Sequence, residues 1–333
     1  MLLYVVGRTI WAGVLVVGVT LVMYVLFFLV PGGGLSLSGS LADESRLADA
    51  GSSQVDTAQQ PLSEYLTFVG HLAQGDLGVS RVTGDDVAWL IGQAAPASAS
   101  LVAGGLVLWL TVALLVGVRS ATHPRGPTDR IGNVFVLFGI SAHPLWLALV
   151  LAWLFGYVLP WFPITGYCDF FRPNDASECG GPVQWAYHLI LPWIVFASAY
   201  AALYTRMIRS GVSENLGEDY VTAARAKGVT ESQVVRRHAL RNALLPIATM
   251  LTMDIGLAFS GTIFVEHVFQ VPGLGFLTFN ALPRRDLPVI LGVLVFSSLV
   301  VIVFSLILDI LHAYVDPRIS SPVAGRRRSA QSR

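Results

Sequence analysis

Three sets of residues in this 333-residue sequence have types and positions that could support chemistry or ligand recognition. The only cysteines, Cys168 and Cys179, could form a disulfide or remain two thiols. Asp254 is the one acid well inside a long apolar run, where a carboxylate is a functional-site hypothesis by default. It could bind a cationic group of a solute or accept a hydrogen bond from a neighbouring helix. The third feature is Lys227, the only lysine.

Lys227 bears on nucleotide chemistry. A Walker A phosphate loop needs glycine and lysine in succession before serine or threonine, because that lysine reaches the phosphates. Lys227 follows Ala226, so the chain cannot form this loop, and any ATP-driven step would need a separate ATPase chain. The apolar runs also contain no HExxH motif, GxSxG motif or paired carboxylates. The sequence therefore predicts no catalytic residue and no enzyme, which argues against an intramembrane protease.

Metal and nucleic-acid sites are not predicted either. Two cysteines without a further cysteine or a histidine close to them make an incomplete zinc site. The chain has a formal net charge of zero, and it has no basic domain with interleaved aromatic residues of the kind that binds nucleic acid.

The composition points to the membrane. Hydrophobic residues make up 54% of the chain and charged residues only 13%, whereas a soluble domain carries about a quarter charged residues. A membrane-crossing helix needs about 20 apolar residues. The first apolar run is too long for a signal peptide and lacks a cleavage site, so we expect it to be retained. The sequence predicts an all-α membrane protein with six transmembrane helices, at 9–30, 97–118, 131–158, 186–208, 243–265 and 287–312.

Basic residues orient these spans. If the N-terminus is cytoplasmic, most of the 21 basic residues fall inside, which favours an N-in, C-in topology by the positive-inside rule. The exceptions are Arg46, Arg81, Arg172, Arg284 and Arg285. Cys168 and Cys179 then lie in the outer loop after the third span. An oxidising exterior favours a disulfide, and two unpaired thiols are the alternative.

The spans divide the chain into four parts. The third part contains a cytoplasmic loop at 209–242 and an outer loop at 266–286. The basic tail is expected to contact anionic membrane lipid. The parts are the N-terminus with the first span (1–30), an extracytoplasmic segment (31–96), the remaining spans (97–312) and a cytoplasmic tail (313–333).

The cytoplasmic loop has the pattern of two short helices joined by a turn. Asn215 begins one capping pattern and Thr230 begins another. Gly228 suits the left-handed position that ends a helix. Pro246 falls at the start of the fifth span, where a proline is tolerated. The loop is either an amphipathic hairpin that lies on lipid or a rigid docking element for a cytoplasmic partner.

This stretch resembles the EAA loop of ABC-importer permeases, whose pattern is EAA-x3-G-x9-I-x-L-P. Ala223, Ala224, Gly228 and Leu240 match that pattern, whereas Thr222, His238 and Arg241 depart from it. Further segments in the same order resemble the dipeptide, oligopeptide and nickel branch of the family. They are "LVPGG", "QPLSEYLTFVGHLAQGDLGVS", "WFPITGY", "GTIFVEHVFQVPGLG", "DLPVILGV" and "DPRI".

The resemblance implies a type I importer permease fold in the cytoplasmic membrane. It also implies four kinds of partner: a second homologous permease, one or two ATPase subunits, an extracytoplasmic solute-binding protein and lipid. ATP and Mg would be bound by the ATPase subunits, so no cofactor is expected in this chain. The residues expected at or near the ATPase contact are Ala223, Ala224, Arg225, Lys227, Gly228, Arg237 and Leu240.

The segment from Val265 to Gly275 contains helix-breaking residues and predicts either a re-entrant scoop or an ordinary outer loop. By resemblance it lies near the translocation pathway and the face that meets the binding protein. The residues expected at this pathway and scoop are Asp254, Glu266, Pro272, Gly273 and Gly275.

The leading functional hypothesis is import of di- or oligopeptides. Nickel or glutathione import by the same architecture is an alternative that the sequence leaves open. An ion-coupled secondary transporter is a more distant alternative, because those proteins often show internal repeats and this sequence shows none.

Overall fold

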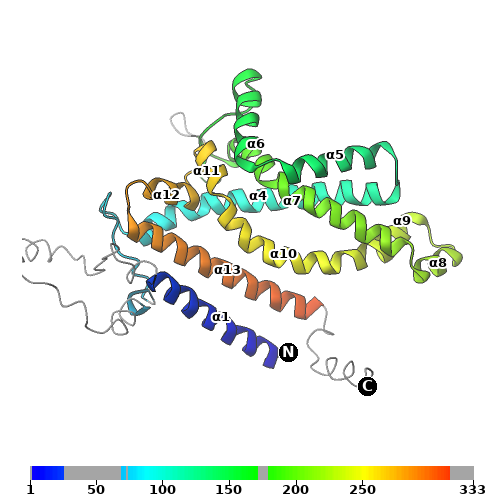
Figure 1. Ribbon diagram of the computed structural model, residues 1–333, viewed down its shortest axis with the longest axis horizontal. Helices are drawn as coiled ribbons and strands as arrows, with labels where there is room; N and C mark the ends of the chain where they lie inside the picture. Colours follow the sequence, from blue (N-terminus) through cyan, green and yellow to red (C-terminus); the bar gives the residue numbers. More distant parts are fainter. Residues whose placement is uncertain (1, 26–68, 73, 172–178, 316–333) are drawn as a thin grey trace, which may run out of the picture. The chain divides into compact units, whose positions relative to one another are not determined.

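The computed structural model describes residues 2–25, 69–72, 74–171 and 179–315, and most of these residues are helical (Figure 1). Within these ranges the only β-pairing is at two isolated bridges, Val79 with Asp86 and Asp169 with Gly180. Most of the predicted extracytoplasmic segment and of the predicted tail lies outside the described residues. The chain forms two compact units, 1–92 with 280–333, and 93–279, which are described separately.

The first unit contains helices from both ends of the chain. Helix α1 (Leu2–Tyr24) packs against α13 (Leu287–Val315). The residue before α13, Asp286, is only 3% exposed. Its carboxylate accepts hydrogen bonds from the Ser80 hydroxyl at 2.5 Å and from the Arg81 N–H at 3.2 Å. These bonds fix the turn that precedes α4 (Val87–Thr122) to the start of α13.

The second unit is organised around α7 (Pro182–Leu216), which contacts five other helical elements of this unit. In the packing of α4 against α7, Trp109 is fully buried and stacks on Tyr200, with ring centroids 4.5 Å apart. Glycines on α4 make room for large α7 side chains. A methyl group added at Gly104 would collide with Trp193, and one added at Gly117 would lie 2.9 Å from Ile208. Small residues of this kind let membrane helices approach closely.

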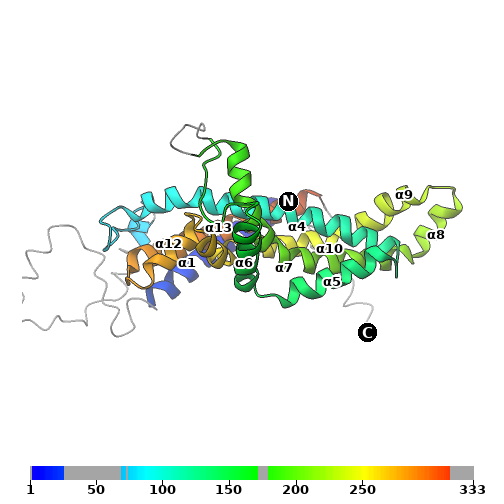
Figure 2. The same ribbon diagram turned by 90° about the horizontal axis from the view of Figure 1, so that it is seen from above.

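The predicted third span is broken. Helix α5 (Pro127–Ser141) is followed by α6 (Pro144–Leu151) and the π-helix η2 (Ala152–Val158), and the two halves meet at an angle of 110°. The views in Figures 1 and 2 show α5 and α6 running in different directions. Pro144 disfavours helical geometry at His143, which has extended torsion angles (φ −68°, ψ 133°). The expectation of one continuous helix over 131–158 is therefore wrong.

The chain continues through α8 (Asp219–Ala226), α9 (Glu231–Gln233), the π-helix η3 (Val234–Leu240) and α10 (Arg241–Gly261). Because α9, η3 and α10 follow one another without a gap, the second predicted loop helix is continuous with the predicted fifth span. Pro246 consequently lies inside α10 rather than at the start of a helix. Helices α11 (Ile263–Phe269) and α12 (Leu274–Ala281) complete the order before α13.

The described residues contain three helices that are long and apolar enough to cross a membrane, or four if the bent pair counts as one span. Three predicted spans correspond to them directly, since 97–118 lies in α4, 186–208 in α7 and 287–312 in α13, whose candidate membrane span is Leu287–Ile307. The apolar stretch of α1, Thr9–Val22, is shorter. The helical fold class is thus confirmed, whereas the six-span count and the orientation stay predictions.

An ion pair connects α5 to α7. The Arg209 guanidinium contacts both oxygens of Asp129, at 2.7 Å and 3.1 Å, and the Arg125 N–H donates to the same carboxylate at 2.9 Å. Asp129 is 4% exposed, so its charge depends on these partners.

We predict that Arg209→Gln lowers the free energy of unfolding by about 1–3 kcal/mol, because it leaves a buried carboxylate without its cation. The expected loss is below that of a fully buried pair, since the Arg209 side chain is 39% exposed. Thermal unfolding of the purified chain in detergent would measure it. Arg130→Gln, at an exposed arginine of α5, is the control. Equal unfolding temperatures for the two variants would contradict this role of the ion pair.

Candidate functional site

The loop at 209–242, which is predicted to be cytoplasmic, is held together by a small polar network. The Tyr220 hydroxyl donates to Asn215 Oδ1 at 2.8 Å and accepts from Asn242 Nδ2 at 3.0 Å. These bonds join α8 to α7 on one side and to α10 on the other. Asn215 lies inside α7, where its amide donates to the Gly211 carbonyl, so the predicted cap by Asn215 is wrong. Helix α8 instead begins after Glu218, whose side chain makes no capping bond.

The turn after α8 has the predicted left-handed geometry. Gly228 has a φ of +79°, directly after Lys227 at the end of the helix. Its N–H donates to the Arg225 carbonyl at 2.9 Å, and the Val229 N–H donates to the Ala224 carbonyl at 3.3 Å. Glycine adopts this conformation without the steric cost that a Cβ atom brings. The chain thereby reverses into Thr230, which precedes α9.

An exposed ion pair spans the same turn. The Arg225 guanidinium donates to both Glu231 oxygens, at 3.0 Å and 2.7 Å. The hydrogen bonds from Arg225 hold the pKa of Glu231 below its usual value, and Glu231 raises the pKa of Arg225 in return. Arg225 is therefore occupied in fixing the end of α8 to the start of α9.

Burial separates the candidate coupling residues into two groups. Ala224 is 8% exposed and packs with Val221 and Val234 in the small core of the loop. Leu240 is half-buried. The remaining candidates are exposed, although Arg225 among them is already engaged by Glu231. They are Ala223, Arg225, Lys227, Gly228 and Arg237.

A cationic groove lies beside this loop. It encloses about 740 Å³, and its lining combines basic residues with Tyr220 and Asn242 of the polar network. The described lining contains no carboxylate. Its basic residues are Arg236, Arg237, His238 and Arg241.

The segment at 266–286, which is predicted to be an outer loop, folds around a buried carboxylate. Glu266 of α11 is 0% exposed. Its Oε1 accepts from the Ser98 hydroxyl of α4 at 2.7 Å, and its Oε2 accepts from the Phe276 N–H at 3.0 Å. Ser98 also accepts a hydrogen bond from the Leu274 N–H, at 2.8 Å. One serine hydroxyl thus connects α4 to the end of α11 and the start of α12.

The turn between α11 and α12 depends on its two glycines. A side chain at Gly273 would collide with the Glu266 carboxylate, and one at Gly275 would lie 2.6 Å from the Ile263 Cα atom. Pro272 is exposed at the tip of the turn. Of the predicted scoop residues, Glu266, Gly273 and Gly275 therefore lie together, and Pro272 faces outward. Nothing in the sequence distinguishes Ser98 from Ser100, which lies in the same apolar run.

Asp254 has its partner inside the same chain. Its Oδ2 accepts from the Tyr204 hydroxyl of α7 at 2.6 Å. Tyr204 is fully buried and lies near Trp109, with ring centroids 6.2 Å apart. This contact fits the second of the two roles considered for Asp254, a hydrogen bond to a neighbouring helix.

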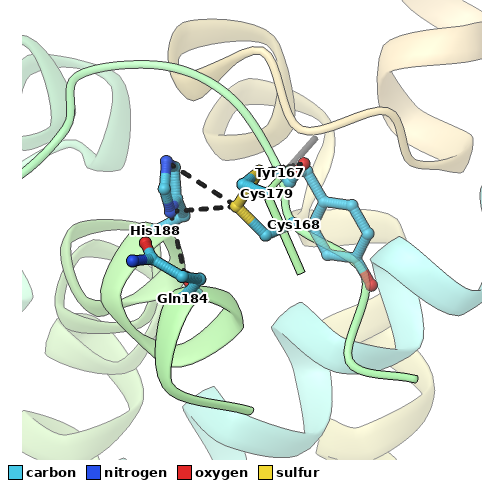
Figure 3. Close-up of a disulfide and its surroundings, with 5 residues drawn as sticks. All are labelled: Tyr167, Cys168, Cys179, Gln184 and His188. Atoms are coloured by element: carbon cyan, nitrogen blue, oxygen red, sulfur yellow. Dashed lines mark hydrogen bonds between the residues drawn. A yellow bond between two sulfur atoms is a disulfide. The ribbon is translucent and has the colours of Figure 1, made fainter. Parts of the chain in front are cut away.

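Cys168 and Cys179 are joined in a disulfide next to the start of α7 (Figure 3). Figure 3 also shows His188 facing this bond, with its Nδ1 at 3.2 Å from the Cys168 sulfur and 2.9 Å from the Gln184 carbonyl oxygen. A histidine thus lies near the cysteines after all. The two sulfur atoms are bonded to each other and offer no thiolate to a metal.

Comparison with known proteins identifies the family. The profile of the binding-protein-dependent transport system inner membrane components matches residues 113–321, more than half of the chain. The chain belongs to this family. Relatives of this permease align over most of their own length. The oligopeptide transport system permease protein AppB of Bacillus subtilis is 34% identical over 95% of this chain and 98% of its own length.

Two further relatives differ in their named solutes. The di/tripeptide transport system permease protein DppB of Pseudomonas aeruginosa is 33% identical over 91% of this chain and 94% of its own length. The glutathione transport system permease protein GsiC of Salmonella choleraesuis is 33% identical over 78% of this chain and 80% of its own length. This chain is thus a membrane permease of the ABC transporter class.

We predict that Ser98→Ala destabilises the permease by roughly 1–3 kcal/mol, because the buried Leu274 N–H loses its acceptor. Glu266 loses one donor but keeps the Phe276 N–H. Ser100→Ala is the matched control, because the half-buried Ser100 hydroxyl has one weaker contact, 3.3 Å from the Tyr167 hydroxyl. Thermal unfolding in detergent measures both. An unfolding temperature for Ser98→Ala at or above that of the control would contradict the bridging role.

We predict that Tyr204→Phe destabilises the permease by about 1.5–3 kcal/mol, because Asp254 loses a hydrogen bond to its charged group. Asp254→Asn should cost less, since an amide oxygen still accepts from Tyr204. Unfolding and solute uptake by both variants separate the two roles of Asp254. Loss of uptake in Asp254→Asn alone, with stability kept, would assign the carboxylate to the solute.

Proposed function

We propose that this chain is the transmembrane permease subunit of an ATP-driven importer that moves di- or oligopeptides across the cytoplasmic membrane. The observation that carries this proposal is the alignment, over nearly the full length of both proteins, with a permease named for oligopeptide transport. The alignment with the di/tripeptide permease supports the same solute class. A full-length match favours the same kind of subunit rather than a shared fragment.

The exposed surface of the cytoplasmic loop supports coupling to separate ATPase subunits, which would bind the ATP and Mg. Ala223, Lys227, Gly228 and Arg237 are exposed there, next to the cationic groove. An ATPase surface that carries carboxylates would complement this groove, and such charge complementarity steers association. The Tyr220 network and the Arg225–Glu231 pair keep the loop rigid. A rigid loop can pass a displacement of the ATPase to the helices.

The remaining architecture follows from the same proposal. Six spans with both termini inside place the turn at Pro272 on the outer face, where a solute-binding protein would deliver the peptide. A second homologous permease would complete the pathway. Glu266, Gly273 and Gly275 then act by shaping the turn, because they are buried and leave the exposed Pro272 as the contact.

Glutathione import is the second candidate, because a glutathione permease is among the relatives and glutathione is itself a small peptide. Nickel import has less support from the described residues. Their one cluster of candidate metal ligands, Cys168, Cys179 and His188, has both sulfur atoms in the disulfide. An ion-coupled secondary transporter is also less supported, since Asp254 is engaged by Tyr204.

We predict that Gly228→Asp leaves the permease inserted in the membrane and uncouples ATP hydrolysis from uptake. A side chain at φ +79° strains the turn, and a carboxylate would intrude on the proposed ATPase contact. The measurement is uptake of a radiolabelled tripeptide, together with ATPase activity, by the complete transporter in vesicles. Retention of normal uptake by this variant would remove the docking hypothesis.

Gly217→Asp is the matched control for this experiment. Gly217 is exposed in the same loop and has a φ of −85°, which any residue adopts. The substitution therefore adds the same charge without the backbone strain.

Competition by dipeptides, longer peptides and glutathione in the same vesicles would identify the solute class. Failure of all of these to compete would contradict peptide import while leaving the coupling result intact.

A further inference from the structure

A pocket of about 290 Å³ lies among α4, α5 and α7 within the second unit, apart from the coupling loop and the outer segment. On α5 its lining residues recur at helical spacing, from Gly132 and Asn133 through Val136 to Ile140, so they share one face of that helix. The other walls come from Ser120 of α4 and from Thr205, Arg206 and Arg209 of α7.

Two hydroxyl groups in this wall lack a protein partner. Ser120 and Thr205 are each 1% exposed, and neither hydroxyl oxygen makes a hydrogen bond within the described part of the chain. A buried hydroxyl without a partner costs about 1–3 kcal/mol, so each such group needs an explanation, and a bound molecule that supplies the hydrogen bond is one. The carboxylates of the same unit, by contrast, all have donors where they are buried.

The pocket also offers positive charge. Arg206 is exposed at its edge, and no ion pair to Arg206 is found among the described residues. Arg209 is held by Asp129, which the Arg125 N–H contacts as well, so the nearest negative charge is already neutralised. The Asn133 amide nitrogen lies 3.5 Å from Asp129 Oδ1, and its second N–H is a further donor at this end of the pocket. The groups together suit an anion with several acceptor oxygens, such as a phosphate.

Apart from Ser141, which follows Ile140 at the apolar end, the polar groups and the apolar groups occupy different levels along α5. Asn133 lies near the end of the helix that carries Asp129, together with the two arginines of α7. Val136, Leu137 and Ile140 follow at up to seven residues further on, which is about 10 Å along a helix. A ligand that fills the pocket would therefore place a charged group at one end and a hydrocarbon at the other.

We propose that this pocket binds the phosphate headgroup of an anionic membrane lipid, with the start of an acyl chain over Val136, Leu137 and Ile140. Basic pockets between transmembrane helices on the cytoplasmic side are a recurring kind of site for such headgroups. Arg206 supplies the charge, and the Ser120 and Thr205 hydroxyls and the Asn133 amide supply hydrogen bonds. The lipid would wedge α5 against α7 next to the Asp129–Arg209 pair.

Native mass spectrometry of the full-length chain in detergent tests this site. The probes are dioleoyl phosphatidylglycerol, dioleoyl phosphatidylcholine and inorganic phosphate, each titrated separately. We expect each chain to retain one molecule of phosphatidylglycerol and to retain much less of the zwitterionic phosphatidylcholine. Arg206→Gln should weaken that retention at least about tenfold, because a charge-assisted hydrogen bond is lost. Thr205→Val, which removes one hydroxyl at constant shape, should weaken it severalfold.

Arg130→Gln is the matched control, since Arg130 is an exposed arginine of α5 that does not line the pocket. It should bind phosphatidylglycerol like the unchanged chain. If Arg206→Gln and Arg130→Gln lose phosphatidylglycerol retention equally, the proposed site is wrong and the lipid is held by a general attraction to positive charge. If inorganic phosphate saturates the pocket and phosphatidylglycerol does not bind, the ligand is a free anion and not a lipid. Exclusion of phosphatidylglycerol from the assembled transporter, with binding to the isolated chain, would assign the pocket to a protein partner.

Discussion

A buried carboxylate in an apolar helix bundle needs a donor from the protein, and this constraint shapes the second unit. The buried Asp129 and Glu266 and the half-buried Asp254 each satisfy it through a side chain from another helix. The alternative in a membrane is an unpaired charge, whose cost exceeds the value of most single contacts. Each pair therefore fixes the relative position of two helices more strictly than apolar packing does. Apolar side chains can slide past one another, whereas a hydrogen bond tolerates a few tenths of an ångström.

Helix α7 supplies the donors for two of these three pairs. Tyr204 and Arg209 lie five residues apart on it, and Asn215 follows six residues later as the anchor of the cytoplasmic loop. A single continuous helix thus connects the loop network to the intramembrane carboxylate. Since α-helices are stiff over this length, a displacement of the loop would move the donor of Asp254 as well. The third pair, Ser98 with Glu266, leaves α7 free and holds the outer turn to α4.

The sequence predicts local features well, because their physical causes are local. Gly228 was expected in a left-handed turn from its position after a helical pattern, and its φ is +79°. The runs at 97–118 and 186–208 lie in long helices, since hydropathy over 20 residues needs no knowledge of neighbours. The errors have local causes too. Hydropathy is insensitive to the break at Pro144, and α7 continues past Asn215 because nothing in the sequence stops it there.

The site contacts could not be predicted in the same way. Ser98 and Glu266 are separated by 168 residues, and Arg209 and Asp129 by 80. No spacing rule relates residues that far apart, and a single serine in an apolar run has the same appearance whether it bridges two helices or faces lipid. The sequence singled out Asp254 because charge is rare in such runs, and Glu266 through the resemblance of its segment, but their neutral partners Tyr204 and Ser98 carry no comparable signal.

The unpartnered hydroxyls of Ser120 and Thr205 differ from the buried carboxylates of the same unit, which have donors. In the same unit the carboxylates obtain partners from residues up to 168 positions away, so the fold is able to satisfy distant polar groups. Ser120 and Thr205 nevertheless remain without partners, next to a cationic side chain and an open volume. The ring nitrogens of Trp109, Trp185 and His267 are also unpaired, but none of these three residues lines this pocket, whereas Ser120 and Thr205 both do. Two unpaired hydroxyls in one open pocket are explained by a bound molecule of the surrounding solvent. For a membrane permease, that solvent includes the phosphate headgroups of lipids.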